Sequence, residues 1–208
     1  MSLTDESRSI VLEEVGPIAI VRFNQPRQRN PLSLSVLNEL DELLDKLHNR
    51  VHISAIIFTG TDSAFLSGAD IRELRSLSPA AALDFSRRGQ QLMSELAETR
   101  QTVIAAINGY CMGGGLDFAL ACHIRVGSPQ AVFAHPGARL GIITGWGGTQ
   151  RLPRLIGKNN ALEMFVSAKQ ITSHEAHRLG LITEIYNPVL AGAVRLAQEV
   201  ITRNASKP

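Results

Sequence analysis

The chain has 208 residues, of which 44% are apolar and 19% are charged, and this composition suits a single folded domain over residues 1–208. Its 21 Lys and Arg residues nearly balance 19 Asp and Glu residues, which argues against nucleic acid or another polyanion as a partner. Two cysteines are too few for a disulfide framework. The longest apolar runs are far shorter than the roughly 18 residues that span a bilayer, so we expect a soluble, cytoplasmic protein without a membrane partner.

The first elements in chain order are two strands and a helix. Residues 10–14 and 18–23 are rich in β-formers and flank a Gly-Pro pair, which predicts a hairpin. Leucines recur along residues 34–49 at the spacing of one helical face, and Ser33 is placed to cap that helix. Residues 55–58 then read as a strand buried on both faces.

The second half continues the alternation of helices and strands. A helix at 79–98 leads into a buried strand at 103–107, and residues 109–115 are predicted to be a flexible, glycine-rich turn. A short buried helix at 116–122 precedes a strand at 123–127. Further helices are expected at 149–156, 158–168 and 173–180, and a last helical pattern runs up to the chain end. This order predicts an α/β class.

The clearest chemical signal is the strand 104–107 followed closely by Gly113, Gly114 and Gly115. Glycines at the start of a helix leave backbone N–H groups unpaired and approachable, and the helix dipole favours negative charge there. The run lacks the Lys-Ser/Thr of a phosphate loop and the spacing of a dinucleotide site. It therefore favours an oxyanion hole, with a close helix-strand packing turn as the alternative.

A second loop, residues 65–72, follows another buried strand. Its Gly68 permits an exposed amide at Ala69, although an ordinary turn with Asp70 as a helix cap is the simpler reading of this loop alone. An effective oxyanion hole needs two donors on one oxygen, and these commonly come from separate segments. The two loops together could therefore supply the two N–H donors of an oxyanion hole, whereas each loop alone supplies one.

These two loops occur in order with Phe-Ala-His-Pro at 133–136 and a glycine-rich segment at 140–153, and nearly the whole chain resembles the enoyl-CoA hydratase/isomerase family, also called crotonases. The resemblance implies a crotonase-like spiral of β-β-α repeats with an α-helical C-terminal part, in which the C-terminal helices are incomplete here. It also implies a homotrimer or dimer of trimers. The expected substrate is a 2-enoyl-CoA thioester, so coenzyme A belongs to the substrate and no separate cofactor is expected.

By the same resemblance, the amides of Ala69 and Gly114 would bind the thioester oxygen. The implied substrate-binding residues are Ala69, Asp70, Ile71 and Gly114. Two nearby arginines, Arg27 and Arg29, are candidates for the CoA phosphates, against the alternative of solvated surface side chains. The implied catalytic set is Asp117 with the two amides, and its reaction would be hydration or isomerisation by a lyase or isomerase.

The departures from the family pattern concern the acids. Hydratases of this family carry a glutamate at each of two positions, which are Asp117 and Gly137 here. Hydration uses paired carboxylates to orient water and move protons, so a single shorter acid predicts a poor hydratase. Isomerases of the family also use an aspartate at the first position, with a further acid that would be sought at Gly145. The alternative to an enzyme is a catalytically impaired homologue that binds CoA thioesters or serves in assembly.

Other side chains give weaker signals. His135 has the residue type for proton transfer near neutral pH, but packing or hydrogen bonding is the favoured reading. His174 and His177 do not form the His-Glu-x-x-His pattern, so no metal site is expected. Cys111 has no neighbouring base in sequence and is interpreted as a structural thiol.

Overall fold

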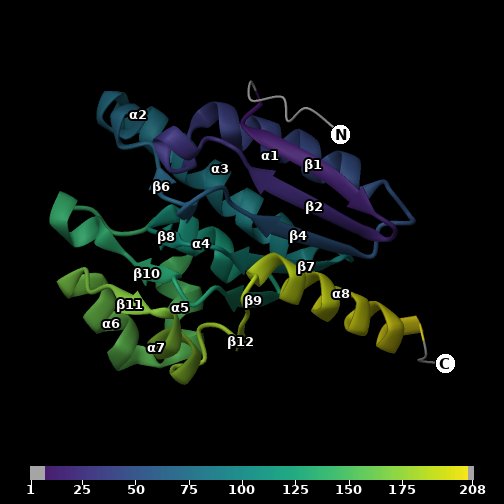
Figure 1. Cartoon of the computed structure of the whole chain (residues 1–208). Helices are drawn as coiled ribbons and strands as arrows, with labels where there is room; N and C mark the ends of the chain where they lie inside the picture. Colours follow the sequence, from purple (N-terminus) through teal and green to yellow (C-terminus); the bar gives the residue numbers. More distant parts are fainter. Residues whose placement is uncertain (1–7, 206–208) are drawn as a thin grey trace.

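The computed structural model describes residues 8–205, which form two main sheets and a short strand pair (Figure 1). The larger sheet has the order β1-β2-β4-β7-β9-β12. Its strands are β1 (Ile10–Val15), β2 (Ile18–Phe23), β4 (Ala55–Thr59), β7 (Thr102–Ile107), β9 (Ile124–Gly127) and β12 (Glu184–Ile185). Within this sheet only the β1-β2 pair is antiparallel, and it is the hairpin that the sequence predicts.

The smaller sheet contains short strands that have no clear signal in the sequence. Its order is β11-β10-β8-β5, and a separate parallel pair joins β3 to β6. These strands are β3 (Pro31–Leu32), β5 (Ala64–Leu66), β6 (Gly68–Ala69), β8 (Tyr110–Met112), β10 (Val132–Ala134) and β11 (Ile171–Thr172). The prediction of a flexible turn at 109–115 is wrong, because residues 110–112 pair with β5 on one side and β10 on the other.

The helices fall close to their predicted positions, except α2 (Ile71–Ser76), for which the sequence predicts a loop up to residue 72 and no helix before residue 79. They are α1 (Leu34–His48), α2 (Ile71–Ser76), α3 (Pro79–Glu98), α4 (Gly114–Ala121), α5 (Gly148–Ile156), α6 (Lys158–Ser167), α7 (Ser173–Arg178) and α8 (Val189–Ala205), with short 3-10 turns η1 (Pro26–Gln28) and η2 (Pro136–Leu140). Ser33 caps α1 by accepting from the Val36 amide, as predicted. Helix α4 begins at Gly114 rather than at residue 116, so the glycine run enters the helix. No helix among residues 8–205 is long and apolar enough to cross a membrane.

The larger sheet is covered on both faces, which explains its continuous apolar strands. On one face, Phe58 and Phe118 pack edge to face with ring centroids 4.9 Å apart, within a core that α1, α3 and α4 complete. On the other face, α8 lies across the strands β4, β7 and β9 (Figure 1) and buries Ala193 and Ala197 against Ile57. The prediction that residues 55–58 form a strand buried on both faces is therefore confirmed.

Candidate active site

Two backbone amides predicted to lie in loops, those of Ala69 on β6 and Gly114 at the start of α4, lie side by side. The Asp70 N–H donates to Leu32 O on β3 at 3.4 Å, so the preceding residue, Ala69, directs its own N–H to the opposite edge of β6. Gly114 lies on that side. A Cβ built on Gly114 would lie 3.3 Å from the Ala69 nitrogen, and one built on Gly68 would lie 3.3 Å from the Gly114 nitrogen.

Each glycine of the run has its own reason to be glycine. Gly113 has φ +51° and donates its N–H to Ala134 O at 2.9 Å, which fixes the run to β10. A Cβ on Gly114 would lie 2.6 Å from Cζ3 of Trp146, and a Cβ on Gly115 would overlap the backbone of Leu66. Gly114 is also the first residue of α4, where a helix has unpaired N–H groups. Close packing and an available amide therefore occur together.

The amides open on a cavity of about 680 Å³ between the smaller sheet, α3 and the segment before α5. Its walls are mostly apolar and include Leu74, Phe85, Ile142, Ile143, Trp146 and Phe165. Among the described residues that line it, the titratable side chains are Arg75, Asp117 and His135. This is a predominantly apolar site with a few polar groups, as expected for a small-molecule pocket.

Asp117 is fully buried in the first turn of α4, and its two carboxylate oxygens differ. Oδ2 accepts hydrogen bonds from the Thr144 hydroxyl and, at 3.3 Å, from the Trp146 amide. Oδ1 has no hydrogen-bond partner among the described residues. Burial raises the pKa of Asp117 to about 6, against the lowering effect of the two hydrogen bonds and of Arg151.

His135 lies beside the unpaired oxygen. Its Nε2 is 3.6 Å from Asp117 Oδ1, and neither ring nitrogen has a hydrogen-bond partner among residues 8–205. Burial lowers the pKa of His135 to about 4, so the ring is neutral at pH 7 and the contact is not an ion pair in spite of its short distance. The ring packs on Phe165 with centroids 5.0 Å apart.

Comparison with known proteins identifies the family. Residues 13–207 match the family model for enoyl-CoA hydratase/isomerase. The chain belongs to the enoyl-CoA hydratase/isomerase family. A short-chain-enoyl-CoA hydratase of Clostridium acetobutylicum is 34% identical, over 95% of this chain and 77% of the relative. A crotonyl-CoA hydratase of Syntrophomonas wolfei is 33% identical, over 94% of this chain and 76% of the relative.

Solved structures agree with this assignment. The crystal structure of an enoyl-CoA hydratase from Bacillus anthracis superposes with a TM-score of 0.89 at 31% identity, covering 93% of this chain and 77% of that one. Pseudomonas aeruginosa DspI superposes with a TM-score of 0.90 at 33% identity, covering 97% and 83%. The predicted crotonase-like fold is therefore confirmed, and the chain is an acyl-CoA enzyme of this family.

Gly137 and Gly145, the positions at which the family resemblance implies a second acid, both lie in the cavity wall. A Cβ on Gly137 would lie 2.6 Å from Ile142 O, and Gly137 does not have a positive φ, so backbone crowding rather than the backbone angle resists a side chain there. Gly145 accepts a hydrogen bond from Gln90 Nε2 at 2.8 Å through its carbonyl oxygen. Among the described residues that line the cavity, Asp117 is thus the only carboxylate.

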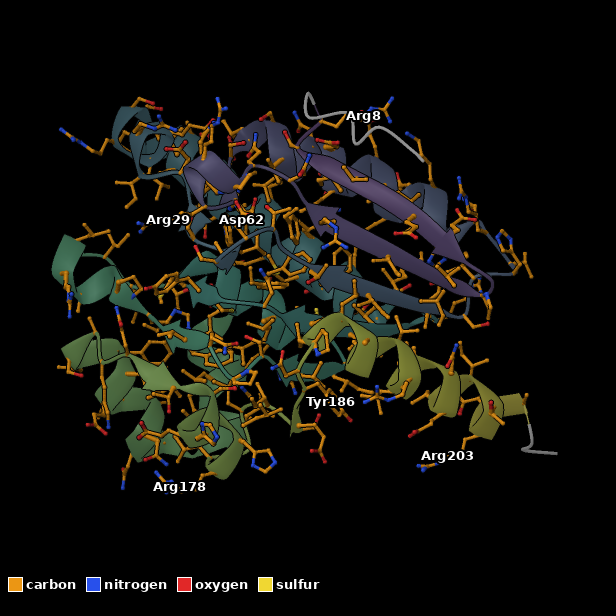
Figure 2. The ribbon with its side chains drawn as sticks, viewed as in Figure 1. Arg8, Arg29, Asp62, Arg178, Tyr186 and Arg203 are labelled. Carbon is orange, nitrogen blue, oxygen red and sulfur yellow. The ribbon has the colours of Figure 1, made fainter. Side chains whose placement is uncertain are left out.

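The other residues singled out in the sequence lie around this centre. Ile71 lines the cavity and is half exposed. Asp70 is not among the lining residues and caps α2, where its carboxylate accepts from the Arg72 amide at 2.8 Å. The Arg72 side chain also holds the pKa of Asp70 below its usual range. Figure 2 shows Arg29 near α2, at the end of the molecule away from the C-terminal end of α8.

The remaining candidates have structural surroundings. Cys111 is buried and donates to Gly115 O at 3.5 Å, and burial raises the pKa of its thiol well above the ordinary value. A buried thiol of this kind is a poor nucleophile. His174 and His177 are both exposed on α7. Within residues 8–205, no group of three His, Cys, Asp or Glu side chains could hold a metal ion.

Proposed function

We propose that the enzyme isomerises enoyl-CoA thioesters by moving the double bond between the 3,4 and 2,3 positions. The observation that carries the proposal is the single cavity carboxylate, Asp117, which has one oxygen anchored and the other free. Ala69 and Gly114 supply the two amides that bind the thioester oxygen. Relatives whose names specify enoyl-CoA hydratase or isomerase support an acyl-CoA substrate of this kind.

The chemistry requires one base and one oxyanion site. The Asp117 carboxylate takes a proton from C2 of the 3-enoyl thioester, and the electrons move into the thioester oxygen to form a dienolate. The resulting acid returns the proton to C4 as the double bond forms between C2 and C3. The substrate and the product have the same atoms, and the proton taken from C2 is the proton returned to C4. The reaction therefore needs neither a second acid nor water. A base with a pKa near the working pH is favoured for such a transfer, and the pKa of Asp117 is about 6.

The oxyanion is stabilised by groups that are already in place. Removing one such donor costs about 2.7–4 kcal/mol of transition-state stabilisation in a well-studied protease. Here the Ala69 amide is fixed by the β3-β6 pair and the Gly114 amide by the start of α4. The free Oδ1 of Asp117 is also what an active enzyme needs, and this argues against the alternative of a homologue that only binds thioesters. Since the thioester is itself the substrate, the reaction needs no separate cofactor.

The test is a steady-state assay with a 3-enoyl-CoA such as 3-hexenoyl-CoA, in which the conjugated 2-enoyl product is followed by absorbance. Asp117→Asn should lower kcat by about 10² to 10⁴-fold with little change in KM, because it removes the base and keeps the shape. Asp84→Asn, at an exposed position on α3, is the matched control and should behave like the parent. A parent without isomerase activity would refute the proposal.

A further inference from the structure

Unpaired polar atoms cluster in the wall of the cavity. Among residues 8–205, four buried side-chain polar atoms have no hydrogen-bond partner, and three of them are Asp117 Oδ1, His135 Nδ1 and His135 Nε2. Leaving one such group unpaired costs about 1–3 kcal/mol. A cluster of three beside a ligand cavity indicates that a ligand supplies the missing partner.

The spacing identifies the kind of partner. Asp117 Oδ1 and His135 Nε2 are 3.6 Å apart, which is too long for a hydrogen bond between them. One oxygen atom at about 2.8 Å from each would bridge the pair. The carboxylate only accepts, whereas a neutral imidazole offers one donor and one acceptor, so the bridging atom must itself be able to donate. Water and a hydroxyl group meet these requirements, and a thioester or alkene does not.

The surroundings hold both groups in position. Asp117 cannot turn freely, because Thr144 and the Trp146 amide hold its other oxygen. The His135 ring is 3% exposed and packs on Phe165. Both side chains line the same cavity as the two amides. A bridging oxygen would therefore lie at a fixed place relative to the bound acyl chain.

We propose that Asp117 Oδ1 and His135 together bind the water that adds to C3 of a 2-enoyl-CoA, so that His135 serves as the water-binding residue where Gly137 provides no acid. This inference rests on the proposed thioester site. It assigns the enzyme a hydratase activity that depends on a histidine instead of on a second carboxylate.

The step balances with the groups present. The Asp117 carboxylate takes one proton of the water while the water oxygen bonds to C3. The electrons of the C2–C3 double bond move to the thioester oxygen, which the amides of Ala69 and Gly114 bind. The Asp117 acid then returns the same proton to C2. His135 remains neutral throughout and orients the water through a hydrogen bond.

The experiment compares two reactions in each variant: crotonyl-CoA hydration and 3-hexenoyl-CoA isomerisation. His135→Phe keeps a ring against Phe165 and removes both nitrogens. We expect it to lower the ratio of hydration kcat to isomerisation kcat by about a hundredfold, as loss of correct positioning typically does. His135→Gln keeps a donor and an acceptor and should restore part of the ratio. His177→Gln, exposed on α7, is the control.

The outcomes separate the two proposals. If His135→Phe lowers both reactions by the same factor, the residue is only structural, and if it lowers neither reaction, the residue does not bind the water. Either result leaves the ratio unchanged and overturns this inference. A parent that hydrates crotonyl-CoA without isomerising 3-hexenoyl-CoA would instead refute the isomerase proposal. In that case butyryl-CoA affinity, measured by calorimetry, replaces isomerisation as the reference for His135→Phe.

Discussion

Asp117 shows how neighbouring residues divide the two oxygens of one carboxylate. Oδ2 is bound by Thr144 and Trp146, which precede α5, whereas Oδ1 is buried 3.6 Å from His135 Nε2 and has no hydrogen-bond partner among the described residues. A Cβ on Gly148 would overlap Oδ1, so glycine at the start of α5 leaves the space that this oxygen occupies. The glycine pair at 147–148 is thus explained in part by a carboxylate on another helix.

The pKa values of Asp117 and His135 have opposite effects on stability. The pKa of Asp117 is about 6 in the folded chain against 3.8 ordinarily, so the native state binds more protons between these values and the free energy of unfolding falls as pH rises. The pKa of His135 is about 4 against 6.5, so the unfolded state binds more protons and the free energy of unfolding rises over that range. In the parent the two effects oppose each other between pH 4 and 6.

Asp117→Asn removes one of these opposing effects and leaves that of His135. The effect of His135 is common to both proteins and cancels in their difference. The free energy of unfolding of the variant, relative to the parent, should therefore rise between about pH 4 and pH 6, by up to about 3 kcal/mol. Urea unfolding at several pH values measures this difference. Asp84→Asn should give a curve parallel to that of the parent. If the free energy of unfolding of Asp117→Asn ran parallel to that of the parent at all pH values, the carboxyl group of Asp117 in the parent would have an ordinary pKa, contrary to the prediction.

At the scale of elements, the sequence predicts those strands and helices that have a periodic apolar pattern or a capping residue of their own. The strands β4 and β7 and the helices α1 and α3 have long apolar patterns or caps, and all lie within one or two residues of prediction. The strands of the smaller sheet have two or three residues each, too few for a periodic pattern. Their existence depends on pairing between segments far apart in the chain, which a single sequence does not show.

The residues of the candidate site that have a local signal in the sequence were predicted, whereas the contacts between distant segments were not. The two amide loops and Asp117 stand out by their glycines and by the family resemblance. The contact of Asp117 with His135 does not, since these residues belong to different elements. It depends on the pairing of β8 with β10, in which the Gly113 N–H bonds to Ala134 O and brings the start of α4 beside residue 135. The nearness of Trp146 to α3 was hidden for the same reason.

The contact between α3 and Trp146 yields a prediction about Gly89. A Cβ on Gly89 would overlap the indole ring of Trp146. The backbone N–H of Trp146 donates to Asp117 Oδ2, so a shift of this residue would disturb the carboxylate. Gly89→Ala gains about 1 kcal/mol of helix propensity but overpacks a buried contact, which typically costs about 1–3 kcal/mol. We expect a net loss of stability in urea unfolding together with a lower kcat. Ser94→Ala, exposed on the same helix, should gain stability only, and a stabilised, fully active Gly89→Ala would contradict the prediction.

At the scale of the whole molecule, large apolar side chains remain exposed around the cavity and α6. Ile142 and Ile143 are 50% and 67% exposed, and Leu162 and Val166 on α6 are 55% and 70% exposed. The 3-10 turn η2, which leads to Ile142, packs against α6. Exposed apolar side chains that gather in one region mark an interaction surface more often than isolated ones do. The assembly that the family resemblance implies, a homotrimer or dimer of trimers, would cover such a surface.

We therefore predict that the chain self-associates and that α6 contributes to the interface. Sedimentation equilibrium should give a mass above the 22.6 kDa of one chain. Burying a side chain such as Leu162 or Val166 stabilises an interface by about 1.5–3 kcal/mol, so replacing both with Asp should weaken association by about a hundredfold or more. Val51→Asp, at an 85% exposed position in the loop after α1, is the control for each single replacement, Leu162→Asp or Val166→Asp, because it also puts one negative charge in place of an exposed apolar side chain but lies outside α6. A monomeric parent at high concentration would disprove self-association, and equal effects of the α6 and Val51 substitutions would remove α6 from the interface.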